Sequence, residues 1–165
     1  MLPGPPLPIL FQDEHLVVVN KPSGLAVHRG WAQDRVVAMT LLRDQLGRHV
    51  FPLHRLDRGA SGALCFALDA RSARVVNEEF QDGEVDKRYL ALVRGIPPTS
   101  GVIDSPVPRT EGGERVPAQT EYRRLGSFER YALVEARPLT GRLHQIRRHL
   151  KHLGHPLIGD VNYGK

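Results

Sequence analysis

The alternation of apolar and polar residues along the chain predicts several strands. The run from Leu16 to Val19 is apolar and largely β-branched, and Pro22 and Gly24 follow it, which is typical of a buried strand. Two later segments alternate with a period of two and predict an antiparallel hairpin. The predicted strands are residues 16–19, 63–68 and 87–95, with 118–125 and 131–138 as the hairpin.

Helical spacing of apolar residues predicts two helices in the first half of the chain. One runs from Asp34, a predicted N-cap, to Gly47, and the other covers residues 70–81. The proline-rich residues 3–8 predict an irregular lead-in, and the Gly- and Pro-rich residues 98–117 predict a loop with room for one short strand. Strands outnumber helices and pair mostly with near neighbours, which predicts an α+β fold: a mixed, mostly antiparallel sheet with flanking helices.

The segment GRLHQIRRHLKHLG, residues 141–154, predicts the last helix. Its apolar residues share one face, and they are Leu143, Ile146, Leu150 and Leu153. Arg147 lies on the flank of this face and is placed to reach inward, whereas Arg148 lies almost opposite and is expected in solvent. Two neighbouring arginines on one helix are therefore expected to have different surroundings.

Composition and charge narrow the classes of protein to which this chain can belong. The length of 165 residues predicts a single domain over residues 1–165, and the net charge of +5 with a pI near 9.8 indicates an anionic partner such as nucleic acid. Aromatic residues make up only 6% of the chain, which disfavours a broad base-stacking platform. The lone Cys65 excludes a disulfide within the chain, and no apolar stretch reaches the roughly 18 residues that span a membrane. We therefore expect a cytoplasmic protein without membrane contact.

The stretch HRLDRGASG, residues 54–62, places Asp57 between Arg55 and Arg58 at the start of a Gly-rich turn. Two interpretations are open from the residues alone. Asp57 forms a local ion pair at the turn, or the flanking arginines keep its carboxylate ionised for chemistry. The glycines of the turn would also let the backbone of a polyanion approach closely.

Other kinds of site are disfavoured. The histidines near the C-terminus are His144, His149, His152 and His155. No cysteine or acidic residue is interleaved with them, and several arginines and lysines would repel a cation, so we expect no metal site. Walker-type and dinucleotide-binding glycine motifs and the GxSxG elbow are absent from the sequence. A glycosidase-like carboxylate pair stays open, because the sequence does not identify a partner for Asp57.

Six segments, taken together, resemble the RluA family of RNA pseudouridine synthases. They occur in the family's order over nearly the whole chain, and residues 28–58 most resemble the tRNA-modifying C-type branch. The segments are NKPSGLAVH (20–28), HRLDRGASG (54–62), KRYLALVRG (87–95), AQTEY (118–122), LTGRLHQIRRHL (139–150) and GHPLIGDVNYG (154–164).

This resemblance implies that the chain isomerises uridine in RNA to pseudouridine without a cofactor. The base is detached at its N1–C1′ bond, turned and rejoined through C5. Asp57 matches the catalytic Asp, which attacks the ribose C1′ or the base, Tyr89 matches the Tyr that packs on the target base, and Arg147 matches the Arg that pairs with that Asp. Arg55 matches a residue that fills the space of the flipped base. The residues expected to bind substrate are Arg55, His54, Arg58, Lys21, Lys87, Arg142 and His144.

The resemblance also implies a partner and marks some departures. The expected substrate is tRNA near the acceptor stem and T arm, with rRNA or a non-catalytic RNA-binding role as alternatives, and we expect a monomer. Ala60 replaces the family's usual Thr, and the segment after Asp104 is short for the tRNA branch. The family usually continues beyond GDVNYGK with a further strand, so we expect a fold shortened at the C-terminus, and we expect no N-terminal S4-like module.

Overall fold

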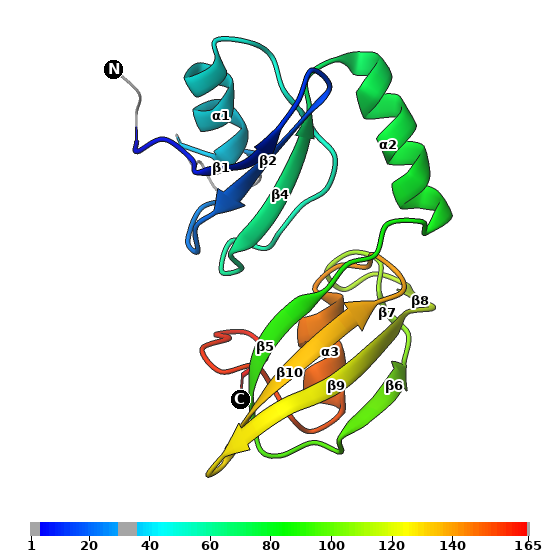
Figure 1. Ribbon diagram of the computed structural model, residues 1–165. Helices are drawn as coiled ribbons and strands as arrows, with labels where there is room; N and C mark the ends of the chain where they lie inside the picture. The colour runs from blue at the N-terminus through cyan, green and yellow to red at the C-terminus, as the bar shows by residue number, and fades with distance from the viewer. Residues whose placement is uncertain (1–3, 30–35, 165) are drawn as a thin grey trace. The chain divides into compact units, whose positions relative to one another are not determined.

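A computed structural model describes residues 4–29 and 36–164 (Figure 1). The chain divides into two compact units, residues 1–82 and 83–165, and each unit is considered by itself. The single domain expected from the sequence therefore stays a prediction. No helix in the described part of the chain is long and apolar enough to cross a membrane.

Unit 1 contains one antiparallel sheet and two helices. Its elements are β1 (Ile9–Gln12), β2 (Leu16–Lys21), α1 (Ala38–Leu46), β3 (Phe51–Pro52), β4 (Gly62–Ala67) and α2 (Ala70–Asp82). The strand order is β1-β2-β4-β3, with β2 and β4 paired along their whole length. The strand predictions at 16–19 and 63–68 and the helix prediction at 70–81 are confirmed, whereas β1 was not predicted.

Both faces of this sheet are packed. Alternate residues of β2 and β4 are fully buried, namely Val17, Val19, Leu64 and Phe66. On the other face, Val76 and Phe80 of α2 pack against Leu53 and Ala67. The predicted N-cap Asp34 lies outside the described residues, and the described helix α1 begins after Val37 and ends at Gly47, which adopts a left-handed φ of 64°.

Unit 2 is built on a second antiparallel sheet. Its elements are β5 (Tyr89–Arg94), β6 (Ser100–Asp104), β7 (Val107–Pro108), β8 (Arg115–Val116), β9 (Gln119–Phe128), β10 (Tyr131–Pro138) and α3 (Gln145–His152). The main sheet has the order β5-β10-β9-β6, and β7 pairs with β8 separately. The predicted strand at 87–95 and the hairpin of 118–125 with 131–138 are confirmed as β5 and β9–β10.

Helix α3 covers one face of this sheet (Figure 1). Leu150 is fully buried among Ala91, Val93 and Val134, while the alternate β5 residue Leu90 is 70% exposed. Antiparallel sheets commonly pack one face against the core and leave the other face in solvent, and this sheet packs one face against the apolar side of α3. The α+β class predicted from the sequence is confirmed.

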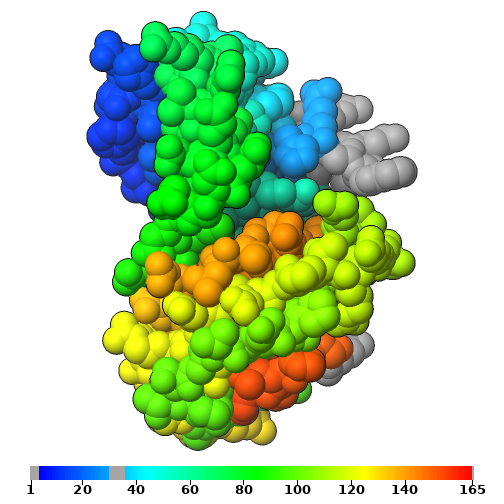
Figure 2. All heavy atoms as spheres, turned by 90° about the vertical axis from the view of Figure 1, so that its right-hand side faces the viewer, coloured from blue at the N-terminus to red at the C-terminus, as the bar shows by residue number. Residues whose placement is uncertain are grey.

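The segment between β5 and β9 is more regular than predicted. Residues 98–117 contain β6, β7 and β8, where the sequence predicts a loop with one short strand. In Figure 2 this segment, drawn in green to yellow-green, lies on the surface of unit 2. Pairing with β9 stabilises β6 despite its glycine, because backbone hydrogen bonds between strands outweigh the weak strand propensity of one residue.

The last helix is shorter than the predicted segment 141–154, and one of its arginines is less exposed than expected. His144 has a left-handed φ of 51°, so the regular helix begins at Gln145. The prediction that Arg148 lies in solvent is wrong: its side chain is 16% exposed and pairs with Glu111 at 3.0 Å. Helical periodicity correctly identified the face of α3 that packs on the sheet. It takes no account of the β7–β8 segment, which contacts another side of α3 through Glu111.

Candidate active site

Asp57 lies in the loop between β3 and β4, and this loop is tied to the segment after β2. The backbone N–H of Gly24 donates to the Arg58 carbonyl at 2.8 Å, and the Ser23 hydroxyl donates to the Gly59 carbonyl at 2.8 Å. The Ala60 N–H closes a turn on the Asp57 carbonyl at 3.0 Å. Asp57 itself is half-buried. The backbone that carries its carboxylate is therefore fixed by hydrogen bonds to the segment after β2.

Lys21 supports the same loop from inside unit 1. Its side chain is fully buried, and the ammonium donates to the carbonyls of Pro22 at 2.9 Å, Leu25 at 2.7 Å and Arg58 at 3.3 Å. An ammonium has three donors, and these carbonyls occupy them. Burial lowers the pKa of Lys21, and the negative charge of Asp57 opposes that decrease. Lys21 thus supports the Asp57 loop, and its predicted contact with substrate stays a prediction.

His54 begins the predicted motif and has a fixed orientation. Its Nε2 accepts the backbone N–H of Cys65 at 3.0 Å, which assigns the ring proton of the neutral side chain to Nδ1. The ring stacks on Phe80 of α2, with 5.4 Å between centroids. His54 therefore ties the loop to β4 and α2, and its predicted contact with substrate stays a prediction. Arg55 and Arg58, on either side of Asp57, are exposed.

Tyr89 is the first residue of β5 and lies opposite Ala136 of β10. Side chains alternate along a strand, so Tyr89 shares the face of Ala91 and Val93, which α3 covers. Tyr89 is half-buried at the end of that face, and Lys87, two residues earlier, is also half-buried. The position suits a side chain that packs on a ligand with one surface and on the protein with the other.

Arg147 projects from α3 and forms a bidentate ion pair with Asp160. The two N–O distances are 2.6 Å from Nε to Oδ2 and 2.9 Å from Nη2 to Oδ1, and Asp160 is only 4% exposed. These bonds, with the backbone N–H groups of Tyr163 and Asn162, lower the pKa of Asp160 to about 2. Arg147 has its carboxylate partner within unit 2. Asp57 belongs to unit 1, and the ion pair between Arg147 and Asp57 stays a prediction.

The other predicted residues of unit 2 lie at the start of α3. Arg142 is exposed, and its Nε donates to the Pro117 carbonyl at 3.3 Å. His144 lies 3.2 Å from the hydroxyl of Tyr163 through Nδ1. The structure thus gathers Arg142, His144 and Arg147 at one helix end. Sequence reasoning missed Asp160 and Tyr163 as their neighbours, although both stand in the GHPLIGDVNYG segment that supports the family resemblance.

The buried histidine of α3 serves the fold. His149 is 1% exposed, with Nδ1 2.9 Å from the Thr120 hydroxyl and Nε2 2.8 Å from the Ser105 carbonyl. Burial lowers its pKa, so the ring is neutral and donates through Nε2. Among residues 4–29 and 36–164, no three His, Cys, Asp or Glu side chains lie close enough together to hold a metal ion.

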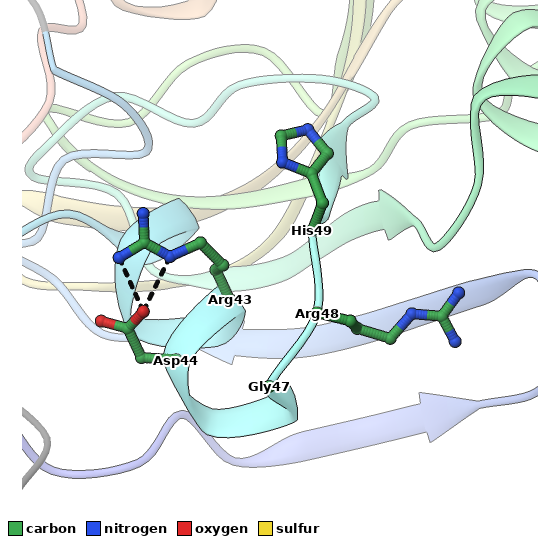
Figure 3. Close-up of a pocket in the computed structure, with 5 residues that line it drawn as sticks. All are labelled: Arg43, Asp44, Gly47, Arg48 and His49. Atoms are coloured by element: carbon green, nitrogen blue, oxygen red, sulfur yellow. Dashed lines mark hydrogen bonds and ion pairs between the residues drawn. The ribbon is translucent and has the colours of Figure 1, made fainter.

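A surface hollow at the C-terminal end of α1 contains none of the predicted site residues (Figure 3). Arg43 and Asp44 pair with each other there, and Arg48 donates to the Leu68 carbonyl at 2.8 Å. Figure 3 shows Arg48 and His49 pointing in different directions, so these two side chains do not converge on one ligand position. The hollow is therefore a weaker candidate site than the Asp57 loop.

Comparisons with known proteins identify the family of the chain. The sequence pattern of the family described as RNA pseudouridylate synthase matches residues 15–152. The chain is similar to tRNA pseudouridine synthase C of Haemophilus ducreyi, with 43% identity over 96% of this chain and 74% of that protein.

Two solved human structures are also similar. RNA pseudouridylate synthase domain containing 1 has a TM-score of 0.85 at 31% identity, covering 100% of this chain and 73% of that one. RNA pseudouridylate synthase domain containing 4 has a TM-score of 0.81 at 34% identity, covering 94% of this chain and 68% of that one. The glycoside hydrolase alternative is thereby replaced, and the chain belongs to the RNA pseudouridylate synthase family, whose members are isomerases.

Proposed function

We propose that this chain converts uridine to pseudouridine in tRNA, at a site near the acceptor stem and T arm. The similarity to relatives named tRNA pseudouridine synthase C supports tRNA as the substrate. The observation that carries the chemistry is the half-buried Asp57, held on a loop that a buried Lys21 and two further hydrogen bonds fasten to the segment after β2. Such prior ordering of a reacting group lowers the entropic part of an activation barrier.

Asp57 is the nucleophile in this proposal, and it attacks either C1′ of the ribose or the uracil ring. In both routes the N1–C1′ bond breaks and the base turns. C5 then bonds to C1′ and loses its proton, N1 gains a proton, and the bond to Asp57 breaks, which regenerates the carboxylate. The uracil that leaves is the uracil that returns, and the proton lost from C5 is balanced by the proton gained at N1, so the overall step is an isomerisation and needs no cofactor. Tyr89 packs on the turning base and receives the C5 proton, and Arg147 pairs with the Asp57 carboxylate.

Cationic side chains bind the RNA in the proposal. Arg58, Lys87, Arg142 and His144 contact backbone phosphates, which makes binding dependent on salt. Arg55 fills the space that the target base leaves. Extrusion of a base costs a few kcal/mol, and these contacts offset it.

The test is tritium release from unmodified tRNA that carries 5-tritiated uridine. We expect Asp57→Asn to lower kcat by at least about a thousandfold, because the neutral amide is a poor nucleophile. Its affinity for tRNA should change by less than about twofold, since the side chain keeps its shape. Asp44→Asn, the same charge change at a surface ion pair of unit 1, should keep the wild-type rate.

The remaining alternatives have their own outcomes in this assay. Tritium release from rRNA fragments and not from tRNA would show that the substrate is rRNA. Salt-sensitive tRNA binding without release at any protein concentration would establish a non-catalytic RNA-binding protein. Product at the wild-type rate from Asp57→Asn would overturn the role of Asp57. Carbodiimide-dependent primer stops should fall in the acceptor stem or T arm of tRNA.

A further inference from the structure

The segment after α3 brings a second set of side chains to Arg147, and this segment is anchored to the sheet. The N–H of Arg94 donates to the Pro156 carbonyl and the N–H of Ile158 donates to the Leu92 carbonyl, both at 2.9 Å. Val93 and Leu157 form an antiparallel bridge between these bonds. The chain thus reaches Asp160 directly from the edge of β5, so the backbone before Asp160 has little freedom.

Asp160 is also held by its own turn. Its Oδ1 accepts the N–H groups of Asn162 and Tyr163, each at 3.0 Å, and the Gly164 N–H donates to its carbonyl at 2.9 Å. A Cβ added at Gly164 would clash with that carbonyl oxygen, so the turn closes as tightly as it does only with glycine. The Asp160 carboxylate is therefore oriented by its own turn, independently of Arg147.

The guanidinium of Arg147 is held on one edge and on one face. Asp160 binds the edge formed by Nε and Nη2, and its two oxygens fix the plane of the group. The Tyr163 ring lies 4.8 Å from the guanidinium carbon, and the hydroxyl of that ring contacts His144. An arginine has many rotamers, and this cluster selects one before any RNA is bound.

We infer that Asp160 is the positioning residue of Arg147, with Tyr163 as its second support, so that the arginine is ordered in advance for the Asp57 carboxylate. The inference rests on the proposed function, in which Arg147 is a catalytic residue. The low pKa of Asp160 means that its carboxylate stays charged at neutral pH. Asp160 acts through Arg147 and touches neither the substrate nor the reacting atoms.

The test is Asp160→Asn with Glu111→Gln as the matched control. Glu111 pairs with Arg148, the residue after Arg147 on α3, and is 78% exposed, so the control makes the same charge change at the partner of the neighbouring arginine. We expect Asp160→Asn to lower kcat by about 10- to 100-fold, the usual cost of a small misplacement of a catalytic group. The affinity for tRNA should stay within about twofold of wild type, and Glu111→Gln should keep the wild-type kcat.

A double-mutant cycle separates positioning from general destabilisation. Lys cannot make the bidentate contact, so in an Arg147→Lys background Asp160→Asn should lower kcat by less than about threefold further. Equal losses of kcat in both backgrounds, or an unchanged kcat in Asp160→Asn, would overturn the inference. Tritium release that is absent in the wild type would overturn the proposed function instead. In that case loss of the Arg147 Nε–H NMR signal in Asp160→Asn supports the positioning role, and its persistence overturns it.

Discussion

The Asp57 loop and the Arg147 cluster each fix one charged side chain, and they do so with different chemistry. In unit 1, Lys21 donates its three ammonium protons to backbone carbonyls and thereby orders the loop that carries Asp57. In unit 2, Asp160 accepts two hydrogen bonds from Arg147 and forms a neutral ion pair. The carbonyl-bound cation keeps its positive charge close to Asp57, whereas the charge of Arg147 is largely compensated by Asp160.

The comparison indicates that each unit orders one of the two charged side chains by its own contacts. A buried cation without a bonded carboxylate costs more desolvation than a paired one, which is why burial lowers the pKa of Lys21. An ion pair with two hydrogen bonds tolerates burial better but depends on both carboxylate oxygens. Variants of the two supports should therefore differ in their effect and in their dependence on pH.

The largest effect is expected from Lys21→Met, which keeps the length of the side chain and removes every donor. Three carbonyls lose their hydrogen bond to a fully buried ammonium, so we expect the free energy of unfolding to fall by roughly 2–4 kcal/mol. The Asp57 loop is released, and kcat should fall by about tenfold or more. Urea unfolding and tritium release measure the two effects.

Lys151→Met is the control for this variant, because Lys151 is exposed on α3. Its free energy of unfolding should stay within about 0.5 kcal/mol of wild type. A Lys21→Met protein that unfolds at the wild-type urea concentration would show that the carbonyls find other donors. That result would contradict the role of Lys21 as the support of the Asp57 loop.

A smaller effect is expected from the acid titration of the Arg147–Asp160 pair. The folded pKa of Asp160 is about 2, below the ordinary 3.8, so the pair contributes stability above pH 3.8 and loses it as pH falls towards 2. The shift corresponds to about 2 kcal/mol at neutral pH. Melting temperatures of wild type and Asp160→Asn should differ at pH 6 and converge near pH 2.

The control is again Glu111→Gln. Because the Glu111 carboxylate is exposed, the melting temperature of this variant should follow that of the wild type closely at every pH. A difference between wild type and Asp160→Asn that does not change with pH would mean that Asp160 stabilises unit 2 through its turn and not through its charge.

The smallest effect is expected from His149, which supports α3 from the core. Burial lowers its folded pKa below 6.5, so its contribution is complete above that pH and declines as pH falls through the folded pKa. His149 faces the Thr120 hydroxyl and the Ser105 carbonyl, with His152 and Asp104 near it. His149→Gln should flatten the stability profile below pH 6.5 in thermal melts. An unchanged slope would assign that decline to another group.

Some features of this protein follow from its sequence. The alternation of apolar and polar residues predicts β2, β4, β5 and the β9–β10 hairpin, because apolar residues at every second position form one face of a strand, and that face has to be buried. Helical spacing places Arg147 on the inward flank of α3, and its partly buried side chain agrees with that. The order of six motifs indicates the family, which the comparisons confirm.

Other features depend on the tertiary structure, because they join residues far apart in the chain. Periodicity shows which way Arg147 points, but not that Asp160 meets it, 13 residues later. The same limit applies to Arg148, which is shielded by Glu111 of the β7–β8 segment. Lys21, which the family resemblance assigns to substrate binding, is fully buried, because three backbone carbonyls from two loops replace water around its ammonium. The sequence alone thus determined the main strands and helices, their buried faces and the family, whereas the short strands and the partner of each charge depend on contacts made in the folded chain.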